Sequence, residues 1–269
     1  MSEPATDAAR VPAVTLSTSS VYPGSCADAF EAAARLGYDG VEVMVWTDPV
    51  SRDPVALRRL ASHYGVPVRS IHAPTLLLTQ RVWGRDPWEK LTRSVELAQE
   101  LDAGTVVAHP PFRWQRDYAA GFVEGVREIA ATSGTTLAVE NMFPWRAGGS
   151  EILAYAPGWD VVGEDYDQVT LDVSHASTSG RDSRELARRL AGRLRHVHLT
   201  DGTGSAKDEH LVPGRGTQPV QGLLEDLAAG GFAGDVVVEI NTRRSRAPGE
   251  RERDLRESLE FTRRHLGQA

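Results

Sequence analysis

Short β-rich apolar runs alternate with amphipathic segments along most of the chain. Eight of the runs are rich in Val, Ile, Leu and Thr and predict strands. The predicted strands cover residues 14–18, 40–45, 66–72, 105–109, 136–141, 169–173, 195–199 and 235–240. Each interval between them has room for a helix and two loops, as a parallel connection requires. Eight βα units in strict alternation predict an α/β protein with a closed (β/α)8 TIM barrel.

The amphipathic segments carry recognisable helix ends. Asp53 and Asp86 each precede a proline, which pairs an N-cap acceptor with a favoured first helical residue. Ser25 is the expected N-cap of the first helix, and Gly37 and Gly65 stand where helices end. The predicted helices cover residues 28–36, 55–64, 88–101, 117–132, a part of 150–162, 183–191, 220–229 and 250–265.

The length supports one barrel without a second domain. The chain has 269 residues, close to the roughly 250 that a (β/α)8 barrel takes. An open doubly wound sheet is the alternative, but no G-x-G-x-x-G loop follows the first predicted strand. We expect a loose tail over residues 1–13 and the barrel over residues 14–269. The tail carries Glu3 and Asp7 and lacks an apolar stretch, so a secretory signal is not expected.

Composition narrows the functional classes. Hydrophobic residues make up 41% of the chain and charged residues 25%, which suits a globular protein with a large core. The single cysteine, Cys26, rules out an internal disulfide and a cysteine-based zinc site, and we expect a cytoplasmic protein. No apolar run is long enough for a membrane span. The net charge of −7 argues against a nucleic-acid partner.

Six consecutive predicted strands, the third to the eighth, end in a histidine or a carboxylate. The C-terminal ends of barrel strands meet at one face, where catalytic groups of this fold lie. Unpaired charges that converge there would repel one another and are costly to desolvate. Divalent cations remove that cost, and this ligand mixture suits zinc or manganese. The candidate metal ligands, with three added by following loops, are His72, His109, Glu140, Asp172, His175, His198, Asp208, His210 and Glu239. His196 shares a strand face with His198 and is expected one layer deeper, in a structural role.

Aromatic and basic residues gather in the loops after the strands. Trp46, Trp83, Trp114 and Trp145 follow the second to fifth predicted strands. Several arginines, among them Arg146 and Arg215, stand in the loops at the same end. Tryptophan rings stack on sugars or bases, and arginine binds phosphate. These six residues are therefore candidates for binding a phosphorylated or polyhydroxylated substrate.

The motifs GYDGVEV, HAP, VEN, LDVSHA, HVHLTD and PGRG resemble those of the xylose-isomerase-like TIM-barrel superfamily, which contains sugar isomerases, epimerases and endonuclease IV. The resemblance to the isomerase and epimerase branch implies one divalent metal held by Glu140, Asp172, His198 and Glu239. It also implies that Glu140 and Glu239 move protons as the catalytic residues. His175 matches a histidine that contacts substrate in that branch.

The endonuclease IV branch holds three zinc ions with nine residues, and all nine have counterparts among the candidate ligands above. The sequence departs from that branch elsewhere. Thr75 replaces an aromatic residue, HPPF and ENMFPW replace other typical loops, and the DNA-penetrating loops are not recognisable. The acidic charge is also unlike that of duplex-binding proteins.

We therefore predict a divalent-metal-dependent isomerase or epimerase of a sugar or sugar phosphate, which transfers a proton next to a metal-polarised carbonyl. The alternative is a trinuclear-zinc phosphodiesterase that acts on abasic-site DNA or a small phosphoester. A dehydratase that acts on an inosose-type ring is a further alternative, because it would use the same site.

The nine matched positions predict more than one divalent ion per chain. Elemental analysis of protein purified without chelator should find two or three ions, zinc or manganese, at full occupancy. A stoichiometry of one after saturation would contradict this prediction and would remove His72, His109, Asp208 and His210 from the ligands.

Overall fold

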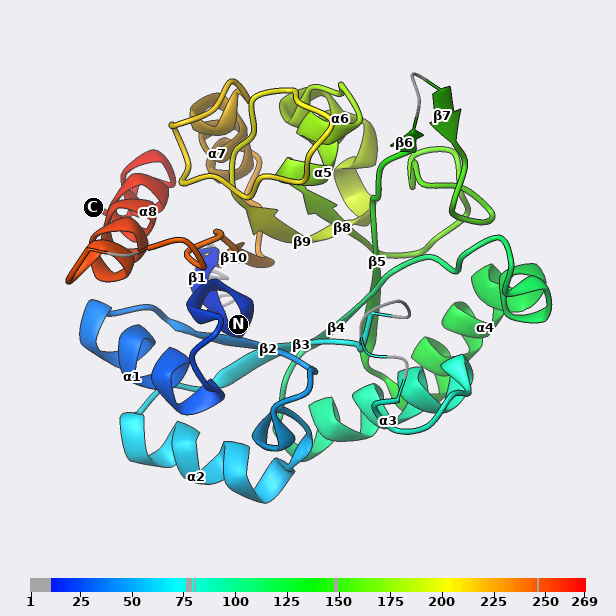
Figure 1. Ribbon diagram of the computed structural model, residues 1–269, viewed down its shortest axis with the longest axis horizontal. Coiled ribbons are helices and arrows are strands. Elements are labelled where there is room, and N and C mark those ends of the chain that lie inside the picture. Colours follow the sequence, from blue (N-terminus) through cyan, green and yellow to red (C-terminus); the bar gives the residue numbers. More distant parts are fainter. Residues whose placement is uncertain (1–10, 76–78, 80, 148–149, 246) are drawn as a thin grey trace, which may run out of the picture.

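Eight parallel strands close into a barrel inside a ring of helices (Figure 1). The computed structural model describes residues 11–75, 79, 81–147, 150–245 and 247–269. The barrel strands are β1 (Ala13–Ser17), β2 (Gly40–Met44), β3 (Val68–His72), β4 (Thr105–Ala108), β5 (Thr136–Glu140), β8 (Val169–Asp172), β9 (Leu194–Leu199) and β10 (Asp235–Val238). They follow one another around the barrel in chain order. The predicted (β/α)8 barrel is confirmed, with every strand within two residues of its expected bounds.

Seven of the described α-helices match segments that the sequence predicts, whereas the short helix directly after β8 was not predicted. The described α-helices are α1 (Cys26–Leu36), α2 (Pro54–Tyr64), α3 (Pro87–Glu100), α4 (Arg116–Ser133), α5 (Val173–Thr178), α6 (Ser183–Leu190), α7 (Val220–Ala229) and α8 (Glu250–His265). The Asp53 carboxylate accepts hydrogen bonds from the first backbone amides of α2, and Ser25 forms a capping box with Asp28 at α1. Gly37 and Gly65 end these helices with φ of +88° and +68°, a conformation that glycine adopts without strain.

The prediction of a helix within residues 150–162 is wrong. After β5 the chain forms an antiparallel hairpin of β6 (Trp145–Ala147) and β7 (Ser150–Ile152), at the edge of the barrel mouth (Figure 1). Beyond it the backbone pairs with the loop after β4: the Arg113 amide donates to Ala154 O, and the Ala156 amide donates to Pro111 O. Pro157 has no amide hydrogen and would disrupt a helix here. The helices between β8 and β9 are α5 and α6.

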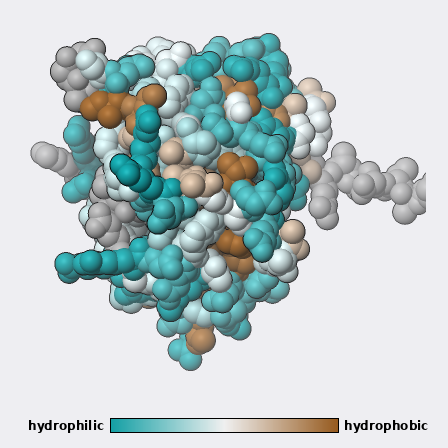
Figure 2. All heavy atoms as spheres, turned by 90° about the vertical axis from the view of Figure 1, so that its right-hand side faces the viewer, coloured by the Kyte–Doolittle hydropathy of each residue, from teal (hydrophilic) through white to brown (hydrophobic). Residues whose placement is uncertain are grey.

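Strand alternation sends apolar side chains outward and polar side chains into the barrel. On β2, Val41 and Val43 belong to the hydrophobic core, while Glu42 between them reaches Ser70 of β3 and His196 of β9. Because successive residues of a strand point to opposite faces, the core lies mainly between strands and helices. The outer face seen in Figure 2 is mostly hydrophilic, with hydrophobic residues in small separate patches.

The two ends of the described chain meet beside β1. The Gln268 side-chain amide donates to Pro12 O at 2.8 Å. The tail predicted over residues 1–13 lies outside the described residues up to residue 10, and Ala13 already belongs to β1. Among the described helices, none has the length and apolar character needed to cross a membrane.

Candidate metal centre

The ends of six barrel strands bring the predicted ligands to one face. His72, Glu140 and Asp172 are the last residues of β3, β5 and β8. His109 and Glu239 directly follow β4 and β10. The register pairs Asp172 with His198 of β9, so these two side chains start from adjacent positions.

Glu140 is surrounded by four imidazoles. Its Oε2 lies 2.9 Å from His109 Nε2 and 3.3 Å from His72 Nε2. Its Oε1 lies 3.1 Å from His175 Nδ1 and 3.3 Å from His198 Nδ1. The carboxylate is buried, so these histidines take the place of solvent around it.

His198 joins Glu140 to two further carboxylates. Its Nδ1 lies 3.1 Å from Glu239 Oε2 and 3.6 Å from Asp172 Oδ2. Ser19 donates a hydrogen bond to the other Glu239 oxygen at 2.9 Å. Asp172 Oδ2 is fully buried and accepts no hydrogen bond from any described residue.

Asp208 and His210 complete the cluster from the loop after β9. His210 Nε2 lies 3.1 Å and His175 Nε2 lies 3.4 Å from Asp208 Oδ2. Ser174 donates to the other Asp208 oxygen at 2.6 Å. All nine residues predicted as metal ligands are therefore linked by contacts within one cluster.

The PGRG motif holds this loop in place. Asp201, buried at the end of β9, accepts hydrogen bonds from the backbone amides of Gly202, Gly214, Gly216 and Gln218. A Cβ on Gly216 would lie 2.3 Å from Asp201 Oδ1. Glycine is therefore required at residue 216 for the loop to close over the carboxylate.

Glu42 is a site residue that the sequence analysis missed. Its Oε2 accepts from Ser70 Oγ and contacts His196 Nε2, both at 2.8 Å, and its Oε1 lies 3.1 Å from His198 Nε2. It lies beneath the cluster and directs the other nitrogen of His198 toward Glu140 and Glu239. His196 lies one layer deeper than His198, as predicted. The sequence signal for Glu42 is its place between two valines in GVEVM. If the valines face the core, the glutamate must face the barrel interior.

Backbone carbonyl groups hold three other histidines of the cluster. Nδ1 of His72, His175 and His210 lies 2.8–2.9 Å from the backbone oxygens of Ala73, Asn141 and Glu239, respectively. Each ring donates through Nδ1 to a carbonyl, which leaves Nε2 facing the carboxylates. Metal-bound histidines are typically held by such an outer hydrogen bond.

The donor set fits a divalent metal. Ligand atoms lie within 4.8 Å of one another in each of three overlapping groups: His72, Glu140 and His198; Asp172, His175 and His210; and Asp172, His198 and Glu239. Imidazole nitrogens and carboxylate oxygens are the usual ligands of zinc, and both also bind manganese. The unpartnered oxygen of Asp172 and the anchored imidazoles match what such a site requires.

The charges of the cluster stabilise one another. Burial opposes ionisation of Glu140, but His109 and His198 outweigh it and hold the pKa of Glu140 well below its usual range. Burial lowers the pKa of His198 and His175, but the surrounding carboxylates raise both well above the ordinary value. Asp208 likewise outweighs burial and raises the pKa of His210 to about 10.

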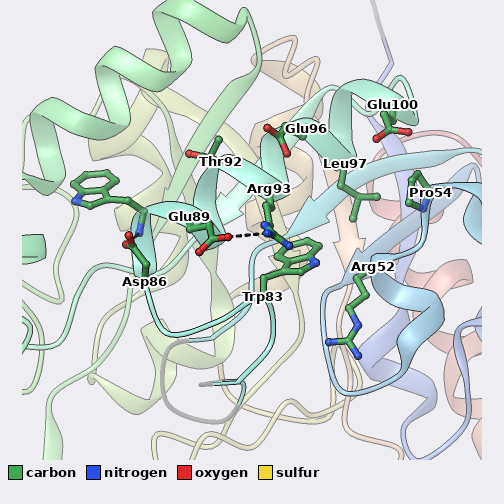
Figure 3. Close-up of a pocket in the computed structure, with 11 residues that line it drawn as sticks. Arg52, Pro54, Trp83, Asp86, Glu89, Thr92, Arg93, Glu96, Leu97 and Glu100 are labelled. Atoms are coloured by element: carbon green, nitrogen blue, oxygen red, sulfur yellow. Dashed lines mark hydrogen bonds and ion pairs between the residues drawn. The ribbon is translucent and has the colours of Figure 1, made fainter.

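A cavity of about 880 Å³ opens above the cluster. Trp46 and Trp145, two of the six candidates for substrate binding, line it. Trp83 lines a different pocket, between α2 and α3, beside the ion pair of Glu89 and Arg93 (Figure 3). The cluster and this cavity are therefore the candidate functional site.

The other three candidates for substrate binding lie outside the described lining of the cavity. Trp114 is 58% exposed and stacks on Phe112, with ring centroids 4.4 Å apart. Arg146 lies 3.5 Å from Glu151 across the hairpin. Arg215 pairs with Asp254 at 2.8 Å and with Glu257, both on α8. In this structure Arg215 fastens a loop to a helix.

Comparison with known proteins agrees with this arrangement. The profile of the family described as "Xylose isomerase-like TIM barrel" matches residues 30–265. The chain belongs to this family. An uncharacterized protein of Mycobacterium tuberculosis (strain ATCC 25618 / H37Rv) is 51% identical over 94% of this chain and 97% of its own length.

Two similar proteins have names that refer to sugars. The fructoselysine 3-epimerase of Shigella flexneri is 24% identical over 80% of this chain and 84% of its own length. The crystal structure of a D-tagatose 3-epimerase-like protein superposes with a TM-score of 0.69 at 24% identity, and covers 94% of this chain and 98% of that one.

The pKa shifts predict how the stability of the metal-free protein depends on pH. His175, His198 and His210 have raised pKa values, so their stabilisation is complete below an unfolded pKa of about 6.5 and is lost as pH rises. Glu140 has a lowered pKa, so its contribution is lost in acid, below about pH 4. Urea unfolding in chelator should give the greatest stability near pH 5–6 and a steady fall from pH 6 to pH 9.

His210→Gln should make the free energy of unfolding fall less steeply between pH 6 and pH 9. His63→Gln, at an exposed histidine of α2, should leave that pH dependence unchanged. Stability that is constant or rises between pH 6 and pH 9 in the wild-type protein would contradict the assigned charges.

Proposed function

We propose that this protein is a divalent-metal-dependent isomerase or epimerase of a sugar or sugar phosphate. One observation carries the proposal: Glu140 and Glu239 approach the same nitrogen, His198 Nδ1, at 3.3 and 3.1 Å. They come from β5 and β10, which are separated by two strands in the barrel, and both line the cavity. Two carboxylates around one point suit proton removal and return at a single substrate carbon.

Glu140, Asp172, His198 and Glu239 would hold the principal ion. A zinc or manganese ion there would act as a Lewis acid that stabilises negative charge developing on a substrate oxygen. The group of Asp172, His175 and His210, with Asp208 beside it, offers ligands for a further ion. This second group supports the prediction of more than one ion per chain.

The surroundings of the two glutamates favour Glu239 as the group that takes the proton. Both oxygens of Glu140 already contact imidazoles, which lower its pKa and make it a weak base. Glu239 has one histidine contact and a hydrogen bond from Ser19. In this mechanism Glu239 removes the proton from the carbon beside the carbonyl. A water molecule returns one, either directly or through Glu140, which is ionised at the outset.

Glu239→Gln keeps the shape of the side chain and removes its basicity. We expect proton exchange to fall by at least about 10²-fold, the usual contribution of a general base. The measurement is solvent deuterium incorporation next to the carbonyl across a panel of ketoses and ketose phosphates. Glu124→Gln, at an exposed pair with Arg127 on α4, is the matched control and should keep wild-type exchange.

Wild-type exchange in a folded Glu239→Gln variant would contradict the role of Glu239. Exchange with none of the panel by the metal-loaded wild-type protein would count against the proposed reaction itself.

A metallo-phosphodiesterase is the second candidate, because the cluster includes more residues than a four-ligand site uses. His72, His109, Asp208 and His210 all contact it. We expect negligible nicking of abasic-site DNA by metal-loaded protein at low salt, where phosphate contacts are strongest. Efficient nicking that is lost in His109→Ala would instead favour the phosphodiesterase.

A further inference from the structure

The cavity above the metal centre is larger and more aromatic than a free monosaccharide requires. Its volume of about 880 Å³ lies toward the upper end of the roughly 300–1,000 Å³ of pockets that hold drug-sized ligands. The polar cluster forms only the floor. Above the floor, two walls rich in aromatic residues come from different parts of the barrel mouth, and Asn241 and Arg243 also line the cavity.

The first wall, formed by Phe112, Phe143, Trp145 and Tyr155, belongs to the loops after β4 and β5. The Phe112 ring centroid lies 5.1 Å from that of Tyr155 and 5.6 Å from that of Trp145. Phe143 lies 5.0 Å from the His175 ring, so this wall reaches down to the floor. Packed rings of this kind offer apolar surface and few hydrogen-bonding groups.

The second wall lies across the barrel mouth. It is formed by Met44 at the end of β2 and by Tyr22 and Trp46 in the loops after β1 and β2. The centroids of Tyr22 and Trp46 lie 6.4 Å apart. Polar neighbours in this wall already bind the backbone: Asp48 accepts from the Cys26 and Val50 amides at 3.0 Å, and Thr18 Oγ1 accepts from the Met44 amide at 2.9 Å. The side-chain oxygens of Asp48 and Thr18 therefore already have backbone partners within the protein.

We propose that the substrate is a keto sugar that also carries an aromatic or similarly bulky apolar substituent, away from its carbonyl group. The inference rests on the proposed function, because that function places the sugar's carbonyl and hydroxyl groups on the polar floor. The hydroxyl groups of a bare hexose on that floor would leave both aromatic walls exposed to water. An apolar substituent between the walls would bury that surface and bind more tightly.

The test compares matched glycosides as ligands, so it does not depend on turnover. The probes are the methyl and phenyl β-D-glucosides and the methyl and phenyl β-D-galactosides, titrated into zinc-loaded protein by calorimetry. Burial of a phenyl ring should make at least one phenyl glycoside bind roughly tenfold or more tightly than its methyl partner. Equal affinity within both pairs, or no detectable binding of either phenyl glycoside, overturns the proposal.

Variants locate the effect in the walls. Trp145→Ala and Tyr22→Ala, one from each wall, should each lower the ratio of phenyl-glycoside to methyl-glycoside affinity at least threefold. Tyr64→Ala, at a partly buried tyrosine of α2 beside His63, is the matched control and should keep the full preference. A preference that survives both wall variants, with folding verified by thermal melting, overturns the assignment.

Failure of the proposed reaction would look different. If no ketose exchanges deuterium but the phenyl preference is present and depends on the walls, the apolar subsite stands and the chemistry on the floor is another one. If exchange occurs with free ketoses and no phenyl preference is found, the proposed reaction stands and the substituent is excluded.

Discussion

Buried carboxylates and imidazoles at the mouth of the barrel depend on one another for charge compensation. An isolated ionised group in such a place costs several kcal/mol, and this structure meets the cost by contact between unlike charges. Glu140 receives four imidazoles, and Glu42 contacts two histidines from below. The strand register places the participants, since Asp172 pairs with His198 in the ladder. A change in register would separate the charges and remove the compensation.

The contacts that hold the imidazole rings also determine which ring nitrogens face the carboxylates. His72, His175 and His210 are each fixed through Nδ1 by a backbone carbonyl, and His198 Nε2 lies 3.1 Å from Glu42 Oε1. The free nitrogens consequently converge on the carboxylates. Preorganisation of this kind is what a metal site needs before it can act on a substrate.

The barrel and its polar strand ends were predictable because both follow from local rules. Alternation and helix caps such as Asp53 define the elements, and a parallel barrel brings all C-terminal strand ends to one face. Six of the nine candidate metal ligands stand at strand ends and needed no knowledge of loop shape. His175, Asp208 and His210 lie beyond the strands and were matched through the family resemblance. Glu42 was missed because its role depends on which strands face one another across the barrel interior. The hairpin after β5 was missed because its backbone pairs with a loop far away in sequence.

Loop side chains were the least predictable part. The place of a residue after a strand does not determine whether its side chain turns toward the barrel mouth. The four tryptophans accordingly lie in different surroundings. Trp46 and Trp145 line the cavity, whereas Trp83 lines a different pocket and Trp114 is exposed. Arg215 pairs with acidic residues of α8, a partner that its own loop sequence does not reveal.

The central claim is that one metal centre lies at the barrel mouth among these side chains. Anomalous diffraction from crystals grown with manganese or zinc tests it most directly. We expect a strong anomalous peak bound by Glu140, Asp172, His198 and Glu239, with a further peak near His175 and His210. Metal-saturated crystals with no peak among these residues, or with ions bound only elsewhere on the protein, would contradict it.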